Sequence, residues 1–191
     1  MRVIEPSELI INPDGTIFHL HMKPEQLADH IILVGDPGRV KMIAAFFDQI
    51  ESETENREFV STTGMYGSKR ITVLSTGIGT DNIDIVINEL DALVNIDLHT
   101  RQIKNERKSL SIIRIGTSGG LQGDIPVNAF LASKKAIGFD GLLNFYERRE
   151  EVSDIAFEES FKSFVQWNKL LPSPYVVEAD QYLFNKIVDN E

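Results

Sequence analysis

Short apolar runs that end in glycine-rich turns recur along the chain, and two of them lead into segments with helical periodicity. The first run, Ile31–Val34, is followed by Gly35, Asp36 and Pro37, after which apolar residues return at the spacing of one helix face. Asp36 is a suitable N-cap, and proline is favoured at the first helical position. The pattern predicts a strand, a tight loop and a helix.

The same order returns after a predicted hairpin. Residues 57–62 and 69–74 have strand composition and flank the turn-like segment GMYGS. The second of these strands ends in TGIGT, residues 76–80, and from Asp81 onward the apolar positions again follow a helical period. The chain therefore contains a second strand, loop and helix.

A third apolar run, Ser111–Ile115, is typical of a buried strand but carries Arg114 inside it and ends in GTSGG. Burying a charge without a partner is costly, so Arg114 needs either a bound anion or a structural carboxylate such as Glu89. Residues 128–133 predict a further strand, and residues 177–188 predict a helix without a capped end.

Strands that alternate with helices predict an α/β fold with a central mixed, largely parallel sheet flanked by helices. The 191 residues, 42% of them hydrophobic, are enough for one domain with a hydrophobic core. No repeat or linker divides the chain, so we expect a single domain over residues 1–191. Ligands bind beyond the carboxyl ends of the strands in such sheets, where the three glycine-rich loops would meet.

These loops have the chemistry of an anion site. Glycine lets backbone N–H groups approach a ligand, and helix N-termini attract negative charge. Arg39 follows the first loop and Arg114 precedes the third, and guanidinium groups bind phosphate through paired hydrogen bonds. Thr117 and Ser118 add hydroxyl groups for an anion or a sugar. One such loop alone is typical of an ordinary turn, whereas three with two arginines favour a phosphate or similar oxyanion.

Charge and composition argue against several other classes of protein. The net charge of −10 disfavours nucleic acid as a partner, because phosphate backbones are held by basic surfaces. The acidic stretch Glu147–Glu159 is typical of a solvated helical face. Cysteine is absent and the pair His19 and His21 lacks a third ligand in the sequence, so no metal site is predicted.

The sequence also lacks the motifs of several common sites. TGIGT does not have the G-x-G-x-x-G spacing of a dinucleotide site, and no lysine follows a P-loop pattern. The N-terminal segment is unlike a signal peptide, and no apolar window is long enough to span a membrane. We therefore expect a cytoplasmic protein without a membrane partner.

The three loops, in this order and spacing, resemble those of the nucleoside phosphorylase family, which includes uridine phosphorylase and the hexameric purine nucleoside phosphorylases. GDPGRV resembles the GDPxR segment of the family, STGIGTDNIDIVINEL its TGIG loop and following helix, and RIGTSGG its R-x-G-T-x-G signature. The resemblance extends from about His19 onward. FHL near the start, REF before the hairpin and STGIG favour uridine phosphorylase within the family.

The resemblance implies a function, reversible phosphorolysis of uridine to uracil and ribose 1-phosphate. A purine nucleoside phosphorylase, a hydrolytic nucleosidase and a non-catalytic phosphate- or nucleoside-binding fragment remain alternatives. Phosphate is then a substrate, and no cofactor is implied. The residues carried over to the phosphate site are Gly35, Arg39, Arg114 and Thr117.

Two further residues are implied to serve a neighbouring subunit. Arg57, in NREF, would contact the phosphate there, and His19, in IFHL, would contact the ribose. Thr117 would also lie beside the ribose, with Ser118 and Gly119 along the base. The resemblance therefore implies a homo-oligomer, either a dimer or a hexamer built as a trimer of dimers.

Two departures from the family pattern stand out. Some relatives hold a monovalent cation at the subunit contact, where Glu58, Ile78 and Asn82 match in position, but asparagine replaces serine at position 82. The uridine-recognition segment and the ribose-binding E-M-E motif are not found between Asp140 and Glu191. We therefore expect a phosphorylase-like domain that lacks its C-terminal part, and an isolated chain that is inactive.

Overall fold

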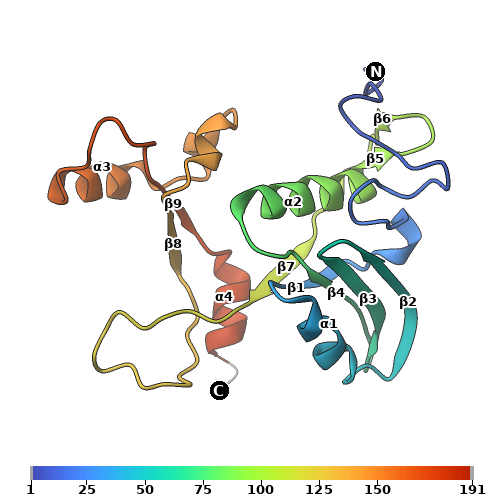
Figure 1. Ribbon diagram of the computed structural model, residues 1–191, viewed down its shortest axis with the longest axis horizontal. Helices are drawn as coiled ribbons and strands as arrows, with labels where there is room; N and C mark the ends of the chain where they lie inside the picture. The colour runs from blue at the N-terminus through green and yellow to red at the C-terminus, as the bar shows by residue number, and fades with distance from the viewer. Residues whose placement is uncertain (1, 190–191) are drawn as a thin grey trace. The chain divides into compact units, whose positions relative to one another are not determined.

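The computed structural model describes residues 2–189 (Figure 1). The chain forms two compact units, of which the first ends at Ser118 and the second begins at Gly119. The expected single domain over residues 1–191 stays a prediction. Every helix in the described part of the chain is too short or too polar to cross a membrane.

The first unit is built on a five-stranded mixed sheet. The strand β1 pairs in parallel with β4 on one side and with β7 on the other, while β2, β3 and β4 are antiparallel. The architecture confirms the predicted mixed sheet flanked by helices. In spatial order the strands are β2 (Gln49–Asn56), β3 (Phe59–Tyr66), β4 (Lys69–Ser75), β1 (His30–Val34) and β7 (Ser111–Ile115).

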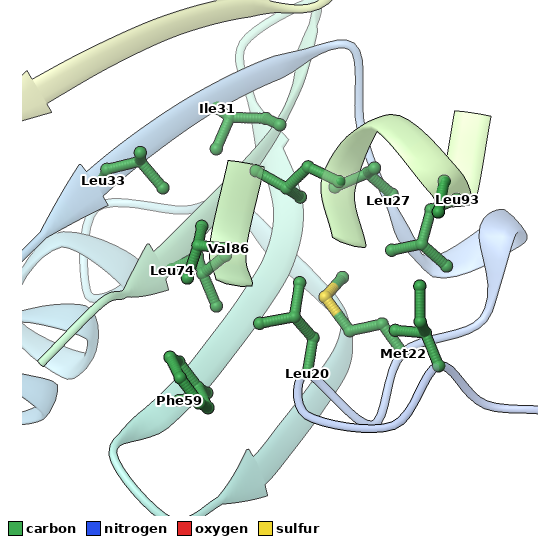
Figure 2. Close-up of a cluster of buried hydrophobic side chains, with 12 residues drawn as sticks. Leu20, Met22, Leu27, Ile31, Leu33, Phe59, Leu74, Val86 and Leu93 are labelled. Atoms are coloured by element: carbon green, nitrogen blue, oxygen red, sulfur yellow. The ribbon is translucent and has the colours of Figure 1, made fainter. Parts of the chain in front are cut away.

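Side chains that alternate along the strands bury opposite faces of this sheet under two helices. Leu33 lies in the cluster that includes Leu90 of α2 (Thr80–Asn95), and the next residue, Val34, lies in the cluster with Val40 of α1 (Pro37–Ala44). The period of two along a strand sends consecutive side chains to opposite faces. The larger of the two clusters is drawn in Figure 2.

The predicted strand–loop–helix units are confirmed, and the hairpin differs in detail. The first of its strands, β3, runs on to Tyr66, so most of GMYGS is strand and the turn is only two residues long. The strand β2 has no counterpart in the prediction. Short elements complete the unit: η1 (Pro24–Gln26), β5 (Ile96–Asp97) and β6 (Gln102–Ile103).

The third apolar run is a strand, but the expectation that it is buried is wrong. The strand β7 has β1 as its one neighbour and forms an edge of the sheet. Ile113 and Ile115 are 36% and 47% exposed, and Arg114 is exposed as well. An edge strand has a partner on one side only, which leaves its far side uncovered.

The second unit contains the antiparallel pair β8 (Lys135–Gly138) and β9 (Tyr175–Glu178). The strand predicted at residues 128–133 is wrong. A strand needs a pairing partner, and β9 pairs with residues 135–138 instead. The helix predicted from 177 starts later, since Val177 pairs within the sheet. The remaining elements are η2 (Leu142–Phe145), η3 (Arg149–Glu151), α3 (Ile155–Phe164) and α4 (Gln181–Val188).

Both α-helices of this unit begin at aspartate caps. The side chain of Asp154 accepts from the backbone N–H of Phe157 at 3.0 Å, and that of Asp180 accepts from Leu183 at 2.8 Å. Such caps satisfy N–H groups that have no partner within the helix. The last of these helices, α4, ends at Val188, where the sequence predicted the end of its last helix.

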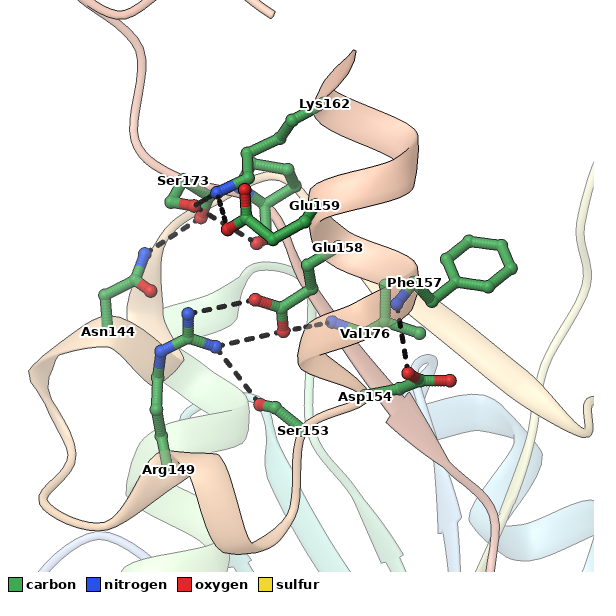
Figure 3. Close-up of polar contacts among 11 residues, drawn as sticks. Asn144, Arg149, Ser153, Asp154, Phe157, Glu158, Glu159, Lys162, Ser173 and Val176 are labelled. Atoms are coloured by element: carbon green, nitrogen blue, oxygen red, sulfur yellow. Dashed lines mark hydrogen bonds and ion pairs between the residues drawn. The ribbon is translucent and has the colours of Figure 1, made fainter. Parts of the chain in front are cut away.

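The acidic stretch of this unit is not simply a solvated face, because Glu158 is 1% exposed. Arg149 donates to both of its carboxylate oxygens at 3.0 Å, and the backbone N–H of Val176 donates to Oε1 at 3.0 Å (Figure 3). Burial opposes the charged form, but the Arg149 and Val176 hydrogen bonds outweigh it and lower the pKa of Glu158. The buried carboxylate of Glu158 therefore joins η3, α3 and β9 of the second unit through its bonds to Arg149 and Val176.

Candidate functional site

The three glycine-rich loops start side by side at one edge of the sheet of the first unit. Val34, the last residue of β1, is in register with Ser75 of β4 and with Ile115 of β7. All three strands run in the same direction, so their carboxyl ends meet there. The backbone N–H of Thr76 donates to the carbonyl of Val34 at 2.8 Å, which joins the first two loops directly.

The guanidinium group of Arg114 lies against glycines of these loops. A methyl group placed on Gly35 would be 3.8 Å from Nη2 of Arg114 and 3.6 Å from the carbonyl oxygen of Gly77. On Gly116 it would be only 2.9 Å from Nη1 of Arg114, which is closer than real contacts allow. Because Nη1 is the end of a flexible, exposed side chain, a methyl group there would only displace the guanidinium. Arg114 lies where all three loops begin.

Arg114 forms no hydrogen bond or ion pair with any residue between 2 and 189. The alternative that Glu89 pairs with it is wrong, because the Glu89 carboxylate is occupied by His19 and Leu20. A guanidinium with five donors and no protein acceptor, beside glycine backbone, has the chemistry to bind an oxyanion.

Arg39 lies in the first turn of α1, directly after the first loop. Its backbone N–H donates to the carbonyl of Asp36 at 3.0 Å, and the Asp36 side chain caps the helix by accepting from Gly38 at 2.9 Å. The side chain of Arg39 is partly exposed and, like that of Arg114, has no ion pair within the described range. The positive end of the α1 dipole is at the same loop.

The turn that carries Arg57 lies against the TGIG loop. Asn56 pairs with Phe59, which leaves Arg57 and Glu58 as a two-residue turn, and Arg57 has a left-handed φ of 56°. The hydroxyl of Ser75 donates to the carbonyl of Glu58 at 2.6 Å. The turn therefore lies at the same edge of the sheet, with the Arg57 side chain exposed.

The three residues matched to a cation site are brought together. The side-chain amide of Asn82 donates to Oε1 of Glu58 at 2.9 Å and to the carbonyl of Ile78 at 3.2 Å. Its nitrogen thus bridges two oxygens that could otherwise bind a cation. Within residues 2–189 there is no group of three or more His, Cys, Asp or Glu side chains arranged to hold a metal ion.

His19 lies beside the Arg57–Glu58 turn, because Asn56 donates to its carbonyl. It is held by Glu89, which the sequence suggested only as a partner for Arg114. The two backbone N–H groups of His19 and Leu20 donate to the Glu89 carboxylate, and Nδ1 of His19 lies 2.6 Å from its Oε1. The signal was present in the sequence: Glu89 interrupts the apolar face of α2 between Val86 and Leu90.

Thr117 and Ser118 are exposed at the end of the first unit, and Gly119 begins the second. Neither hydroxyl has a hydrogen bond to another described residue. Their implied places beside phosphate, ribose and base stay predictions, as do the roles of the other carried-over residues.

The chain belongs to the Phosphorylase superfamily, whose family model matches residues 29–190. The family predicted from the three motifs is therefore confirmed.

Individual relatives include both pyrimidine and purine enzymes. The chain is 33% identical over 129 residues to a uridine phosphorylase of Treponema pallidum, covering 68% of this chain and 45% of that protein. It is 39% identical over 110 residues to a DeoD-type purine nucleoside phosphorylase of Clostridium perfringens, covering 57% of this chain and 41% of that protein. The chain thus spans less than half the length of these curated relatives.

Among solved structures, the chain superposes with a TM-score of 0.81 on a nucleoside phosphorylase of Trypanosoma brucei. That protein is described as showing uridine phosphorylase activity. It is 34% identical, and the match covers 95% of this chain and 61% of that one. The similarity includes both compact units, so the second unit also has a counterpart in a nucleoside phosphorylase.

Proposed function

We propose that this chain forms the phosphate-binding part of a nucleoside phosphorylase, a pentosyltransferase that converts uridine and phosphate to uracil and ribose 1-phosphate. The observation that carries the proposal is the position of Arg114. Its guanidinium lies against Gly35 and Gly116 at the carboxyl edge of three parallel strands and has no acceptor among the described residues. The family membership and the uridine phosphorylase relatives support this reading.

The chemistry follows from holding phosphate beneath the sugar. As the bond from C1′ of the ribose to the base nitrogen breaks, its electron pair leaves with the base and positive charge develops on the ribose. A phosphate oxygen then forms the new bond to C1′, and the departing base takes up a proton. Arg114, Arg39 and the backbone N–H of Gly35 would orient the phosphate and keep its charge close to the developing cation.

Under this proposal the site is completed by a second copy of the chain. Arg57 would contact the neighbour's phosphate and His19 its ribose, and the exposed position of Arg57 in a tight turn suits such a reach. The unit would be at least a dimer and, by analogy with the family, a hexamer. We expect it to act in the cytoplasm without a cofactor.

Calorimetry of phosphate binding to the 191-residue chain tests the proposal. We expect binding by the wild type, at least a tenfold weaker affinity for Arg114→Ala, and unchanged affinity for Arg107→Ala, an exposed arginine of the same unit. Equal phosphate affinity in wild type and Arg114→Ala would refute the assignment of the site.

Substrate assays separate the related activities. Uridine, inosine and methylthioadenosine, each with and without phosphate, distinguish a uridine phosphorylase from a purine phosphorylase and from a hydrolytic nucleosidase. We expect the isolated chain to be inactive. Extension by the part of the Trypanosoma brucei protein beyond the matched region should give phosphate-dependent uracil release, whereas phosphate binding without release would favour a non-catalytic module.

A further inference from the structure

The buried carboxylate of Glu89 directs all of its hydrogen bonds to two consecutive residues. Glu89 is 8% exposed and lies in the middle of α2. The backbone N–H of His19 lies 3.0 and 3.1 Å from its two oxygens, the N–H of Leu20 donates to Oε2 at 2.9 Å, and Nδ1 of His19 lies 2.6 Å from Oε1. The carboxylate thus holds both the backbone and the ring of His19.

Other groups fix the remaining sides of His19. Its carbonyl accepts from the side-chain amide of Asn56 at 2.8 Å. The ring meets Phe18 edge to face at a centroid distance of 4.8 Å, and Phe59 at 6.3 Å. The side chain is 26% exposed, and Nε2 has no partner in the part of the chain that the structure describes. The ring is therefore held firmly, with one nitrogen free.

The contact with Glu89 also decides which nitrogen carries the hydrogen. An ionised carboxylate only accepts hydrogen bonds, so the nitrogen bonded to it must donate. Nδ1 therefore bears the hydrogen, and in the neutral ring Nε2 presents a lone pair. The free nitrogen of His19 is then a hydrogen-bond acceptor.

We infer that Glu89 is a positioning residue, which holds His19 in the Nδ1–H form so that Nε2 accepts a hydrogen bond from a sugar hydroxyl in the neighbouring subunit's site. The inference rests on the proposed function, in which His19 contacts that sugar. A hydroxyl can donate to Nε2, whereas a phosphate ester dianion or an ether oxygen only accepts. The arrangement disfavours a nucleotide that carries its phosphate on the hydroxyl that Nε2 contacts.

A purely structural role of Glu89 makes a different prediction. In Glu89→Gln the amide oxygen can still accept from the backbone of His19 and Leu20, while the amide NH2 group faces Nδ1 and donates to it. The ring hydrogen then moves to Nε2, which becomes a donor. A positioning role requires this reversal, whereas a carboxylate that only anchors the backbone would leave the ring tautomer unchanged.

Long-range 1H–15N NMR of the histidine rings in the 191-residue chain measures the tautomer without requiring activity. The chain has 4 histidines, and His19→Asn assigns the signal. We expect the Nδ1–H form in the wild type and in Asp91→Asn, an exposed carboxylate of the same helix, and the Nε2–H form in Glu89→Gln. The exposed His21 is an internal reference. An Nε2–H ring in the wild type overturns the inference even if the variant fails to fold.

Titration of the phosphate-loaded chain, extended as for the substrate assays above so that the sugar- and base-binding segments are present, tests the sugar contact separately. We expect uridine to shift the Nε2 resonance of His19, and one of the 2′-, 3′- and 5′-deoxy analogues to leave it unshifted, which identifies the hydroxyl. Uridine 5′-monophosphate should bind at least tenfold more weakly than uridine if that hydroxyl is the 5′ one. If the Nδ1–H form is found and no nucleoside shifts Nε2, the role of His19 in the proposed function fails. Glu89 then orients the ring without acting on the substrate.

Discussion

In the first unit the guanidinium of Arg114 lies among glycine loops and has no acceptor within residues 2–189, whereas in the second unit Arg149 makes hydrogen bonds of 3.0 Å to both oxygens of a buried glutamate. The two units also differ in how many hydrophobic side chains they bury. Of the buried hydrophobic side chains in residues 2–189, only Val176 belongs to the second unit. The first unit has a hydrophobic core, whereas the second has little apolar core and contains the ion pair between Arg149 and the buried Glu158.

The contrast between the two units explains why Arg114 can be left unpaired and Arg149 cannot. A unit stabilised by apolar burial does not depend on Arg114 for folding, so this arginine can remain unpaired at the edge of the sheet. A unit with little apolar core depends on the paired charge, because removing one partner leaves the other without a counter-charge. Substitutions in the two units should therefore have different consequences.

The largest effect is expected in the hydrophobic core of the first unit. Phe59→Ala should destabilise that unit by about 3–5 kcal/mol, because Phe59 is 1% exposed and its removal leaves a cavity beside Leu74 and α2. Chemical denaturation followed by far-UV circular dichroism measures the loss. The single tryptophan, Trp167, lies in the second unit, so its fluorescence reports that unit separately. A transition unchanged by Phe59→Ala would contradict a core of this kind.

The next effect concerns the ion pair of the second unit. Glu158→Gln should cost about 2–3 kcal/mol in the transition followed by Trp167 fluorescence, because Arg149 loses its charged acceptor. Glu159→Gln is the matched control on the same helix: its carboxylate is 66% exposed and pairs with Lys162, so it should change stability little. Equal losses in the two variants would show that burial of the pair is unimportant.

The same pair predicts the response to acid. The pKa of Glu158 in the folded chain is below its ordinary value of 4.5. A lowered folded pKa gives stability that is present above the unfolded pKa and is lost as pH falls through the folded value. The tryptophan-detected transition of the wild type should therefore weaken below about pH 4.5, and that of Glu158→Gln should depend less on pH there. An identical pH dependence would exclude Glu158 as the cause.

A smaller effect is expected at a glycine of the TGIG loop, beside the proposed phosphate site. Gly77 has a φ of 67°, and an added methyl group would lie 2.7 Å from Cγ of Glu58, so Gly77→Ala should cost about 2 kcal/mol. Gly67 has a φ of 57° with open space around it, so Gly67→Ala isolates the backbone strain at about 1 kcal/mol. Denaturation of both variants checks whether the additional loss is confined to Gly77, which lies in the TGIG loop. Phosphate calorimetry checks whether binding weakens in the same variant.

The sequence predicted the elements that position the proposed phosphate site because its signals are local. A glycine-rich turn after an apolar strand marks the carboxyl end of that strand wherever the strand lies in the sheet. The strand β2 was missed because QIESETEN has few apolar residues, and it forms through pairing with β3. The exposure of Arg114 and the burial of Glu158 depend on which strands and helices become neighbours, and no local pattern contains that information.

The smallest effect on stability is expected for Arg114→Ala, and it decides the comparison between the two arginines. Since Arg114 has no acceptor among the described residues and is exposed, its removal should change the free energy of unfolding of the first unit by less than about 0.5 kcal/mol. Arg149→Ala, the matched substitution in the second unit, should cost about 2–3 kcal/mol because it leaves the Glu158 carboxylate buried without a counter-charge. Phosphate should then stabilise the wild type and Arg149→Ala in their first-unit transitions and leave Arg114→Ala unaffected, since a ligand that binds only the folded state raises its stability. A large loss of stability in Arg114→Ala without phosphate would mean that the guanidinium serves the fold.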